Sequence, residues 1–290
     1  MRVLVTGAQG QLGAEVVADL AKRAERQVHG RPLEVIAATR ETLDVANRDM
    51  VLAAITTIEP DVVIHAAAFT AVDACESDPD RAYLVNALGT RHVAEAARMV
   101  HAHLAYVSTD YVFDGMKSTP YVEWDATNPL SVYGRSKLGG ELELSCESTI
   151  VRTSWVCGRY GQNMVKTVLR LMASAHQPLR FVDDQRGCPT VASDLAAMLV
   201  MLALERRPGV FHVTNQGATS WFDFVRAIVG FAGGEPDTVL PISTAELDPP
   251  RPAPRPMNSV LDNTALKLSS IELLPPWQES IEALIAELLS

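Results

Sequence analysis

The chain has 290 residues, of which 48% are hydrophobic and 21% are charged, so it is long enough to bury a large core. Its formal net charge of -10 argues against a nucleic-acid partner, because binding to phosphate backbones normally requires a basic face. No apolar stretch reaches the roughly 20 residues that a membrane-spanning helix needs. The four cysteines form no Cys-x-x-Cys pair, and Met1 is followed almost at once by an apolar run and a glycine loop, so we expect a cytoplasmic protein with free thiols and no signal peptide.

In the first half of the chain, short apolar runs alternate with longer patterns of helical period. This alternation favours an α/β fold with a doubly wound parallel sheet, in which ligands bind at the carboxyl ends of the strands. The apolar runs predict buried strands at Arg2–Thr6, Leu33–Ala38, Val62–His65, Leu104–Ser108 and Ile150–Trp155. The longer patterns predict helices at Leu12–Ala24, Arg48–Ile58, Gly89–His101 and Pro129–Cys146.

Three glycines at three-residue spacing, Gly7, Gly10 and Gly13, lie directly after the first predicted strand and open the first helix. A dinucleotide-binding turn needs a positive φ, a backbone without side chains where the pyrophosphate approaches, and a helix N-terminus that favours an anion. An isolated glycine triplet can be a purely structural turn, but its position here favours dinucleotide binding.

The pattern of elements changes after Trp155. The run from Leu240 to Pro256 contains six prolines, which exclude a regular helix and favour an extended lid or strap. We expect residues 1–157 to form a Rossmann domain and residues 158–290 to form mainly a substrate-binding lobe, with segments near 190–216 as candidates to return to the first sheet. The elements predicted in this half are helices at Asn163–Ala175, Ala192–Leu204 and Gln278–Leu289, and strands at Leu179–Val182 and Val210–Val213.

The residues after the second predicted strand bear on the choice of cofactor. That strand is followed by Arg40 and has no acidic residue at its end to bind a ribose 2′-hydroxyl. A cation there can pair with a 2′-phosphate, which favours NADPH over NADH, although Arg40 can equally be a solvated loop charge. Asp44 and Val45 are candidates to reach the adenine, or Asp44 caps a helix that starts near Ala46.

A phenol and an ammonium stand four residues apart at Tyr133 and Lys137, which places them on one helix face. A nearby cation stabilises a phenolate and lowers the pKa of the phenol, which makes Tyr133 a candidate acid. This spacing alone is more often a surface pair. Thr109 at the end of an apolar strand strengthens the case, because its hydroxyl can polarise a carbonyl oxygen that Tyr133 protonates while a nicotinamide supplies hydride. Lys137 is expected to hold the nicotinamide ribose as well.

With these motifs the sequence resembles the extended short-chain dehydrogenases, and within them the reductases of keto groups on nucleotide-linked sugars. The resemblance spans nearly the whole chain. The motifs that carry it are Gly7 to Gly13, Ala66 to Asp73 with Glu76, Ser108 to Gly115, Tyr133 to Lys137, Arg152 to Val156, Asp184 to Thr190 and Arg255 to Ser259.

The resemblance implies roles for further residues. Gln11, Leu12, Ala68 and Thr70 would line the cofactor, Tyr133 would donate the proton, and Thr109, Asp110 and Trp155 would meet the substrate. A substrate diphosphate on an acidic protein needs cations, which makes Arg186 and Arg255 candidates, although either can be solvated. Trp155 can alternatively be a core aromatic.

Other interpretations stay open at this point. Nucleotide-sugar epimerases and 4,6-dehydratases share the fold and would also use Tyr133 and Lys137, and the regulatory subunit of methionine adenosyltransferase resembles the family as a binding protein. Some family members bind magnesium between subunits through glutamates. Glu15 fits one such position but Ser193 occupies another, so we expect no metal. A homodimer is a further expectation, although no residue spacing requires one.

Overall fold

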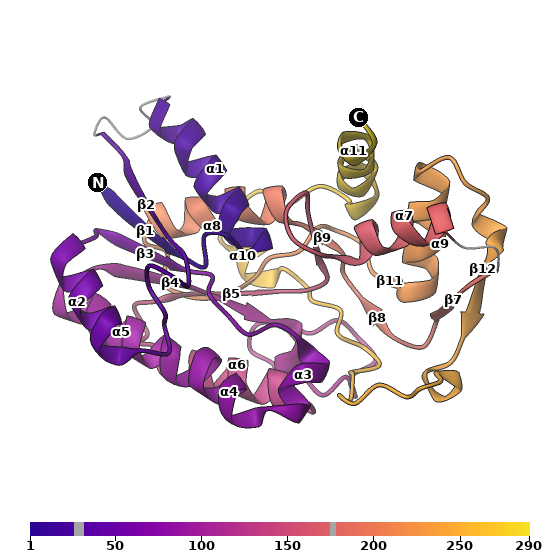
Figure 1. The fold of residues 1–290 in the computed structure, drawn as a ribbon, viewed down its shortest axis with the longest axis horizontal. Helices are drawn as coiled ribbons and strands as arrows, with labels where there is room; N and C mark the ends of the chain where they lie inside the picture. The colour runs from indigo at the N-terminus through magenta and orange to yellow at the C-terminus, as the bar shows by residue number, and fades with distance from the viewer. Residues whose placement is uncertain (26–31, 175–177) are drawn as a thin grey trace.

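The computed structural model describes residues 1–25, 32–174 and 178–290. Its centre is a six-stranded sheet in the order β10-β5-β4-β3-β1-β2, in which every neighbouring pair is parallel (Figure 1). The α/β doubly wound fold is therefore confirmed. The strands are β1 (Arg2–Thr6), β2 (Glu34–Ala38), β3 (Val62–His65), β4 (His103–Thr109), β5 (Thr149–Thr153) and β10 (Gly209–His212).

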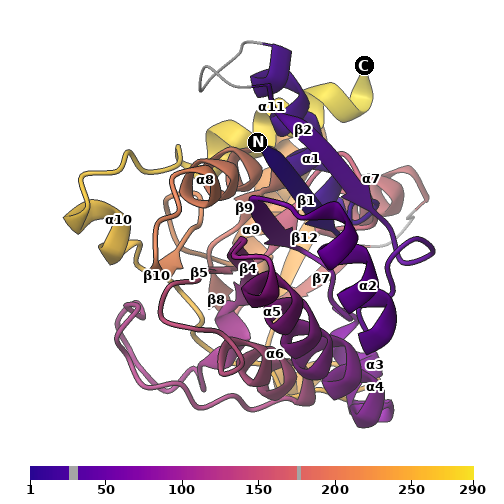
Figure 2. The same cartoon turned by 90° about the vertical axis from the view of Figure 1, so that its left-hand side faces the viewer.

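Helices cover both faces of this sheet, as Figure 2 shows. On one face, α1 (Gln11–Glu25) packs on α8 (Ala192–Leu204). On the other face lie α2 (Arg48–Ile58), α5 (Gly89–Met99) and α6 (Val132–Glu141). Two separate apolar clusters fill the spaces under these helix layers. The strand order reverses beside β1, so the carboxyl ends of β1 and β3 border a crevice of the kind where doubly wound sheets bind ligands.

The remaining elements build a second layered unit beside the sheet. Its apolar core joins α7 (Met164–Ser174), α9 (Trp221–Phe231) and α11 (Trp277–Leu289). Its short strands are β6 (Val156–Cys157), β7 (Leu179–Val182), β8 (Arg186–Gly187), β9 (Thr190–Val191), β11 (Thr219–Ser220) and β12 (Val239–Ile242). The short helical segments of the chain are α3 (Val72–Ser77), α4 (Pro79–Tyr83), η1 (Leu84–Leu88), η2 (Asp110–Val112), η3 (Pro236–Thr238), η4 (Thr244–Glu246) and α10 (Thr264–Leu268).

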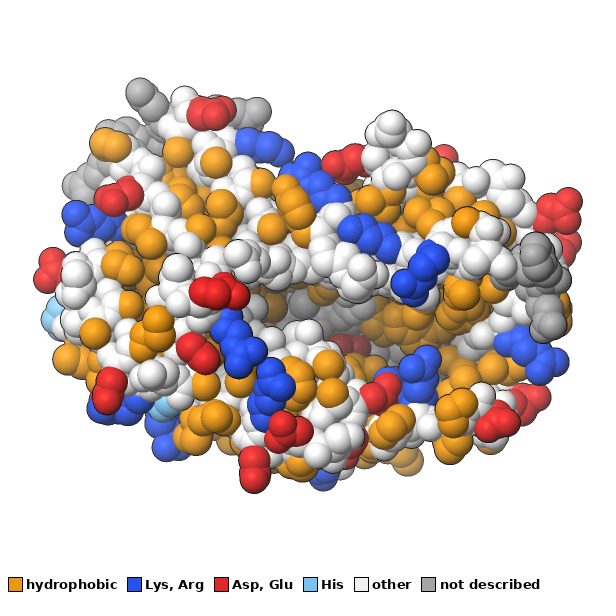
Figure 3. Space-filling view, viewed as in Figure 1, with side chains coloured by type: hydrophobic (Ala, Val, Ile, Leu, Met, Phe, Trp, Pro, Cys, Tyr) orange, Lys and Arg blue, Asp and Glu red, His pale blue; other side chains and the backbone are white. Residues whose placement is uncertain are grey.

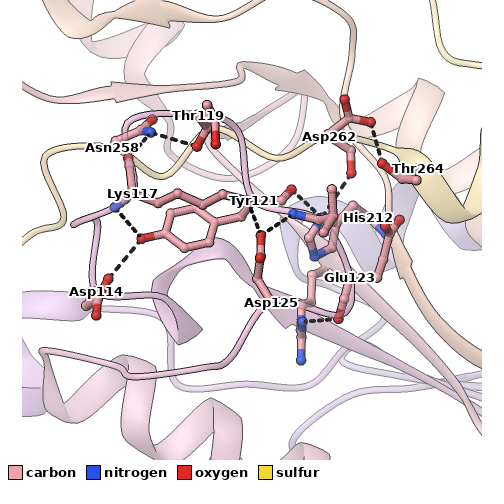
Figure 4. A network of polar contacts seen from close by, with 12 residues as sticks. Asp114, Lys117, Thr119, Tyr121, Glu123, Asp125, His212, Asn258, Asp262 and Thr264 are labelled. Atoms are coloured by element: carbon pink, nitrogen blue, oxygen red, sulfur yellow. Dashed lines mark hydrogen bonds and ion pairs between the residues drawn. The ribbon is translucent and has the colours of Figure 1, made fainter.

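The segment before the C-terminal helix returns to the sheet through a buried polar network (Figure 4). One carboxylate oxygen of Glu123 accepts hydrogen bonds from the backbone N–H groups of His212 in β10 and Ala265 in α10, each at 3.0 Å. The Tyr121 backbone N–H donates to the Val260 carbonyl at 2.8 Å. These contacts hold residues 260–265 against β10, directly after the proline-rich run.

Several predicted boundaries were wrong. The helix expected over Pro129–Cys146 is confined to Val132–Glu141, because Ser131 caps its first turn by accepting the Gly134 N–H. The strand expected to reach Trp155 ends at Thr153, and Trp155 adopts a left-handed φ of 47°.

Other differences concern the ends and the number of helices. The helix expected to reach His101 ends at Met99. Helix α2 begins at Arg48 with Asn47 as its cap, not near Ala46. The predicted end of α7, Ala175, lies outside the described residues. Helix α9 and the short helices were not predicted. The proline-rich run is extended at β12, as expected, but it also contains the short helical turn η4.

Candidate functional site

The glycine turn after β1 leaves no room for side chains. Gly7 has a φ of 68°, and a Cβ there would lie 2.7 Å from the Ala67 backbone. A Cβ on Gly13 would lie 2.1 Å from the Gly7 carbonyl oxygen, so the helix packs directly on the turn. Gly10 is exposed, and a Cβ there would contact only the Gly7 oxygen, at 3.1 Å. Only this one contact within the protein opposes a side chain at Gly10. Its exposed backbone is therefore open to an anion, such as a phosphate, that approaches from outside.

Beside this turn lies a cavity of about 250 Å³. It gathers residues from the ends of β1, β2 and β3 and from the helical segment α4–η1. Six of the predicted cofactor residues line it: Gly7, Gly10, Arg40, Asp44, Val45 and Ala68. Sequence reasoning missed the other lining residues: Gln9, Thr39, Leu43, Ala66, Ala67, Phe69, Arg81 and Val85.

Two cations belong to this cavity. The Arg40 side chain is 71% exposed and lies 3.8 Å from the Asp44 carboxylate, a weak contact that leaves its guanidinium accessible. Arg81 stacks over the Phe69 ring at 4.8 Å. The bare glycine turn and these cations make a cavity of the size and charge that a dinucleotide phosphate requires.

The structure does not bring all the predicted cofactor residues to the cavity wall. Leu12 packs into the core beneath α1 and α8, and Gly13 faces Gly7. The Gln11 amide donates to the Val156 carbonyl at 2.7 Å, which joins the first turn of α1 to the second unit. Thr70 is exposed at the start of the segment that leads to α3.

Thr109, Asp110 and Tyr133 meet at the carboxyl end of β4. Thr109 ends the strand, and its hydroxyl donates to the Asp110 carboxylate at 3.0 Å. Tyr133 lies in the first turn of α6, whose start is fixed by Glu76 accepting the Val132 N–H at 2.8 Å. All three residues of the cluster are buried.

The electrostatics of Tyr133 differ from the expectation. Burial raises the pKa of its phenol above the ordinary value, and the neighbouring Thr109 hydroxyl only partly counters that effect. The expected lowering of the Tyr133 pKa is therefore not found, because burial outweighs the neighbouring groups that would lower it. The Tyr133 phenol is held in its protonated form, the state that a proton donor requires.

Lys137 lies one turn further along α6 and is 2% exposed. Its ammonium donates to the Val107 carbonyl at 2.7 Å and sits 4.1 Å from the centre of the Tyr106 ring. Burial lowers the pKa of Lys137 to about 7, and the Glu141 carboxylate opposes that shift. His65 at the end of β3 is a core residue, since its ring contacts the Thr6 hydroxyl at 2.7 Å.

Asp110 is a buried carboxyl group in the same cluster as Tyr133. Burial raises its pKa from 3.8 to about 6, although bonds to Ser259 and Thr109 oppose the shift. Its second carboxylate oxygen is buried and has no hydrogen-bond partner among the residues that the structure describes. An unpartnered acceptor at this position is a candidate to bind a ligand hydroxyl.

Figure 3 shows a hollow across the middle of this face of the molecule. The other predicted substrate residues come from the end of β5 and from the second unit. Trp155 is half-buried and stacks on Trp221. Arg255 contacts Tyr111 and donates two hydrogen bonds to the Asp73 carboxylate, at 2.8 and 3.0 Å. Arg186 is exposed, and its backbone pairs with the segment just beyond Arg255.

Within the described residues, no group of three His, Cys, Asp or Glu side chains could hold a metal ion. Glu15 is instead paired with Arg159, whose guanidinium lies 3.0 Å from the carboxylate. In the same part of the chain, no helix is long and apolar enough to cross a membrane.

Comparison with known proteins identifies the family. The family model described as "RmlD substrate binding domain" matches residues 1–290. A dTDP-4-dehydrorhamnose reductase of Aggregatibacter actinomycetemcomitans is 41% identical over 97% of this chain and 97% of that protein. The crystal structure of a dTDP-4-dehydrorhamnose reductase from Clostridium acetobutylicum is 40% identical and covers 100% of both chains with a TM-score of 0.91.

A second solved structure carries a ligand. The dTDP-4-dehydrorhamnose reductase of Bacillus anthracis, solved in complex with NADP, is 37% identical and covers 99% of both chains with a TM-score of 0.89. The resemblance found in the sequence motifs is thus confirmed over the full length of the chain. On these grounds the chain belongs to the dTDP-4-dehydrorhamnose reductase family of oxidoreductases.

Proposed function

We propose that the chain reduces the 4-keto group of dTDP-4-dehydro-L-rhamnose to give dTDP-L-rhamnose, a precursor of surface polysaccharide. The observation that carries this proposal is the buried cluster at the end of β4, where the protonated phenol of Tyr133 lies beside Thr109. The cluster lies at the end of β4, which pairs with β3 in the sheet. The end of β3 in turn borders the glycine cavity. A proton donor and a dinucleotide cavity at one sheet edge suit a carbonyl reduction.

NADPH is the proposed cofactor, with NADH as the second choice. Gly7, Gly10, Asp44, Val45 and Ala68 would hold it, together with the exposed guanidinium of Arg40, which would pair with a 2′-phosphate. The relative from Bacillus anthracis was solved with NADP. The remaining predicted cofactor residues would act indirectly, by fixing the glycine turn and its neighbours. They are Gln11, Leu12, Gly13 and Thr70.

When bound, the reduced nicotinamide supplies a hydride to the carbonyl carbon. Tyr133 gives its phenolic proton to the carbonyl oxygen, and its raised pKa keeps that proton in place until charge develops on the oxygen. The Thr109 hydroxyl polarises the same oxygen. The Lys137 ammonium holds the ribose hydroxyls and stabilises the phenolate that remains on Tyr133.

The substrate would lie between the two layered units. Asp110 would accept a sugar hydroxyl on its unpartnered oxygen, and Trp155 would pack on the sugar ring. Arg186 and Arg255 would meet the diphosphate. In domain terms, we propose that residues 1–157 form the dinucleotide-binding domain, joined by the segment near 190–216, and that the rest of 158–290 is mainly the substrate-binding lobe.

Two broader properties complete the proposal. We propose a cytoplasmic location, because all four cysteines are free thiols, which suits a reducing compartment. We also propose a homodimer, which sedimentation of the purified chain would test, with a monomer at working concentration as the contrary result.

Mass analysis of the sugar nucleotide after incubation with NADPH separates this function from those of enzymes with the same fold. A reductase adds two hydrogen atoms to dTDP-4-dehydro-L-rhamnose, an epimerase leaves the mass unchanged, and a 4,6-dehydratase removes water from its own hexose substrate. Gain of two hydrogens supports the proposal. An unchanged mass of dTDP-4-dehydro-L-rhamnose, with the cofactor bound, would overturn it.

A further inference from the structure

Glu141, the last residue of α6, carries a buried carboxylate that accepts three hydrogen bonds from two residues. It accepts two hydrogen bonds from the Arg152 guanidinium, at 2.9 Å from Nε and 2.7 Å from the terminal nitrogen. It also accepts the hydroxyl proton of Ser108 in β4. The side chains of the ion pair are only 5% and 6% exposed. The carboxylate therefore joins α6 to both β4 and β5 in a region that water does not reach.

The Ser108 contact and the position of Glu141 on α6 both relate this carboxylate to the proposed catalytic residues. Ser108 directly precedes Thr109 in β4, so its bond to Glu141 fixes the strand end that presents the Thr109 hydroxyl. Lys137 lies four residues before Glu141 on the same helix, which places the two side chains on one face. The Glu141 carboxylate is thus bonded to the residue before Thr109 and lies on the same helix face as Lys137.

The groups around Lys137 make Glu141 its electrostatic partner. From β4, Lys137 meets the Tyr106 ring and the Val107 carbonyl. From β3 it meets His65, whose pKa falls to about 3 through burial and the nearby ammonium, so the imidazole is neutral at pH 7. Of the charged groups described, Glu141 is the one that supports the ammonium form, against the lowering of the Lys137 pKa by burial.

We propose that Glu141 is a positioning residue for the reduction: it keeps Lys137 as an ammonium ion and holds the Thr109 end of β4 against α6. This inference rests on the roles assigned to Lys137 and Thr109 under the proposed function. If the ion pair were purely structural, Glu141 would only neutralise Arg152. Replacing both residues with uncharged side chains would then leave NADPH binding unaffected.

Glu141→Asp and Glu141→Asn form a matched pair for testing the charge. Both shorten the side chain by the same methylene group, and only the first keeps a negative charge. The measurement is the dissociation constant of NADPH, without sugar, from about pH 6 to about pH 9, a range that brackets the Lys137 pKa of about 7. In the wild-type chain, we expect the affinity for NADPH to fall as the pH rises through that value, because the ammonium donor is lost.

The expected result is that Glu141→Asn moves this fall to lower pH by about one unit, while Glu141→Asp keeps it near the wild-type position. An identical shift in both variants, or a shift in neither, would overturn the proposal.

The double variant Glu141→Gln/Arg152→Met covers the case in which an unpaired Arg152 unfolds the single variants. It removes both buried charges, so it should fold, as a thermal unfolding scan would show. We expect it to display the same downward shift in the pH dependence of NADPH binding. A wild-type pH dependence in this folded double variant would show that Glu141 only satisfies Arg152. Failure of the wild-type chain to bind NADPH or NADH at all would instead refute the proposed function.

Discussion

The indole rings of Trp155 and Trp221 lie face to face, with centroids 3.6 Å apart and planes inclined by 10°. Trp155 follows β5 of the central sheet, whereas Trp221 begins α9 of the second unit. A Cβ on Gly187 would lie 2.5 Å from the Trp155 ring, so a glycine is required beside it. The stacked pair therefore joins the two halves of the molecule where the substrate is proposed to bind.

Trp155→Ala should raise KM for the sugar substrate by about tenfold, because an aromatic contact and the support of the stacked pair are both lost. The dissociation constant of NADPH should stay unchanged, since the glycine cavity is untouched. Steady-state kinetics with both substrates varied would measure this. Trp124→Ala is the control, because Trp124 is 68% exposed. Equal effects of the two substitutions would remove Trp155 from the site.

Tyr133→Phe should lower kcat by about 10²- to 10⁴-fold, the range over which a positioned general acid contributes. Binding of NADPH should be nearly unchanged, because the substitution removes one hydroxyl from a buried ring. Turnover and cofactor titration on the same preparation would check both statements. Wild-type turnover in this variant would exclude Tyr133 as the proton donor.

Gly10→Ala should weaken NADPH binding by about an order of magnitude while the protein stays folded. The added Cβ would lie in the phosphate approach and would contact only the Gly7 oxygen within the protein. Gly230→Ala in α9 is the matched control, because its Cβ would make an ordinary contact with Pro236 at 3.4 Å. Titration of the two variants would show the difference, and equal affinities would argue against this turn as the pyrophosphate site.

Arg40→Ala should raise KM for NADPH by about tenfold or more and leave KM for NADH unchanged, because only NADPH carries the 2′-phosphate. Arg207→Ala is the control, since Arg207 forms an exposed ion pair with Glu205. A parallel loss with both cofactors would mean that Arg40 does not read the 2′-phosphate.

Asp110→Asn should stabilise the free protein above pH 6 and impair substrate binding. The folded protein raises the pKa of Asp110 from 3.8 to about 6, so it binds the proton more tightly than the unfolded chain does. Wild-type stability is therefore lost as the pH rises through this interval, by about 3 kcal/mol, and the amide avoids that loss. Thermal unfolding of both proteins at acid and alkaline pH would test the sign. The prediction would be contradicted if the stability advantage of Asp110→Asn over the wild type became smaller as the pH rises.

The sequence predicted the sheet and the glycine turn because both depend on local patterns. Continuous apolar runs mark buried parallel strands, and the positions of Gly7 and Gly13 follow from sterics within a few residues. The proximity of Thr109 and Tyr133 was predictable because Thr109 ends a strand and Tyr133 lies in the first turn of a helix. Helix α9 was not predicted, although Ser220 caps it by accepting the Asp223 N–H.

What escaped prediction depends on contacts between distant segments. Arg81 reaches the cavity because α4 folds back beside the end of β3. Asp73 pairs with Arg255, which lies 182 positions further along the chain. The sequence therefore could not show that the Arg255 guanidinium is paired. The raised pKa of Tyr133 is a consequence of tertiary burial, which the spacing to Lys137 does not encode.

The most direct test of the central claim is the loss of reduced-nicotinamide absorbance when dTDP-4-dehydro-L-rhamnose, made in situ by the upstream enzymes, is added to the protein with NADPH and then with NADH. We expect rapid oxidation that is faster with NADPH and that Tyr133→Phe abolishes. No oxidation of either cofactor, although both bind, would contradict the assignment of this chain as a reductase of that sugar.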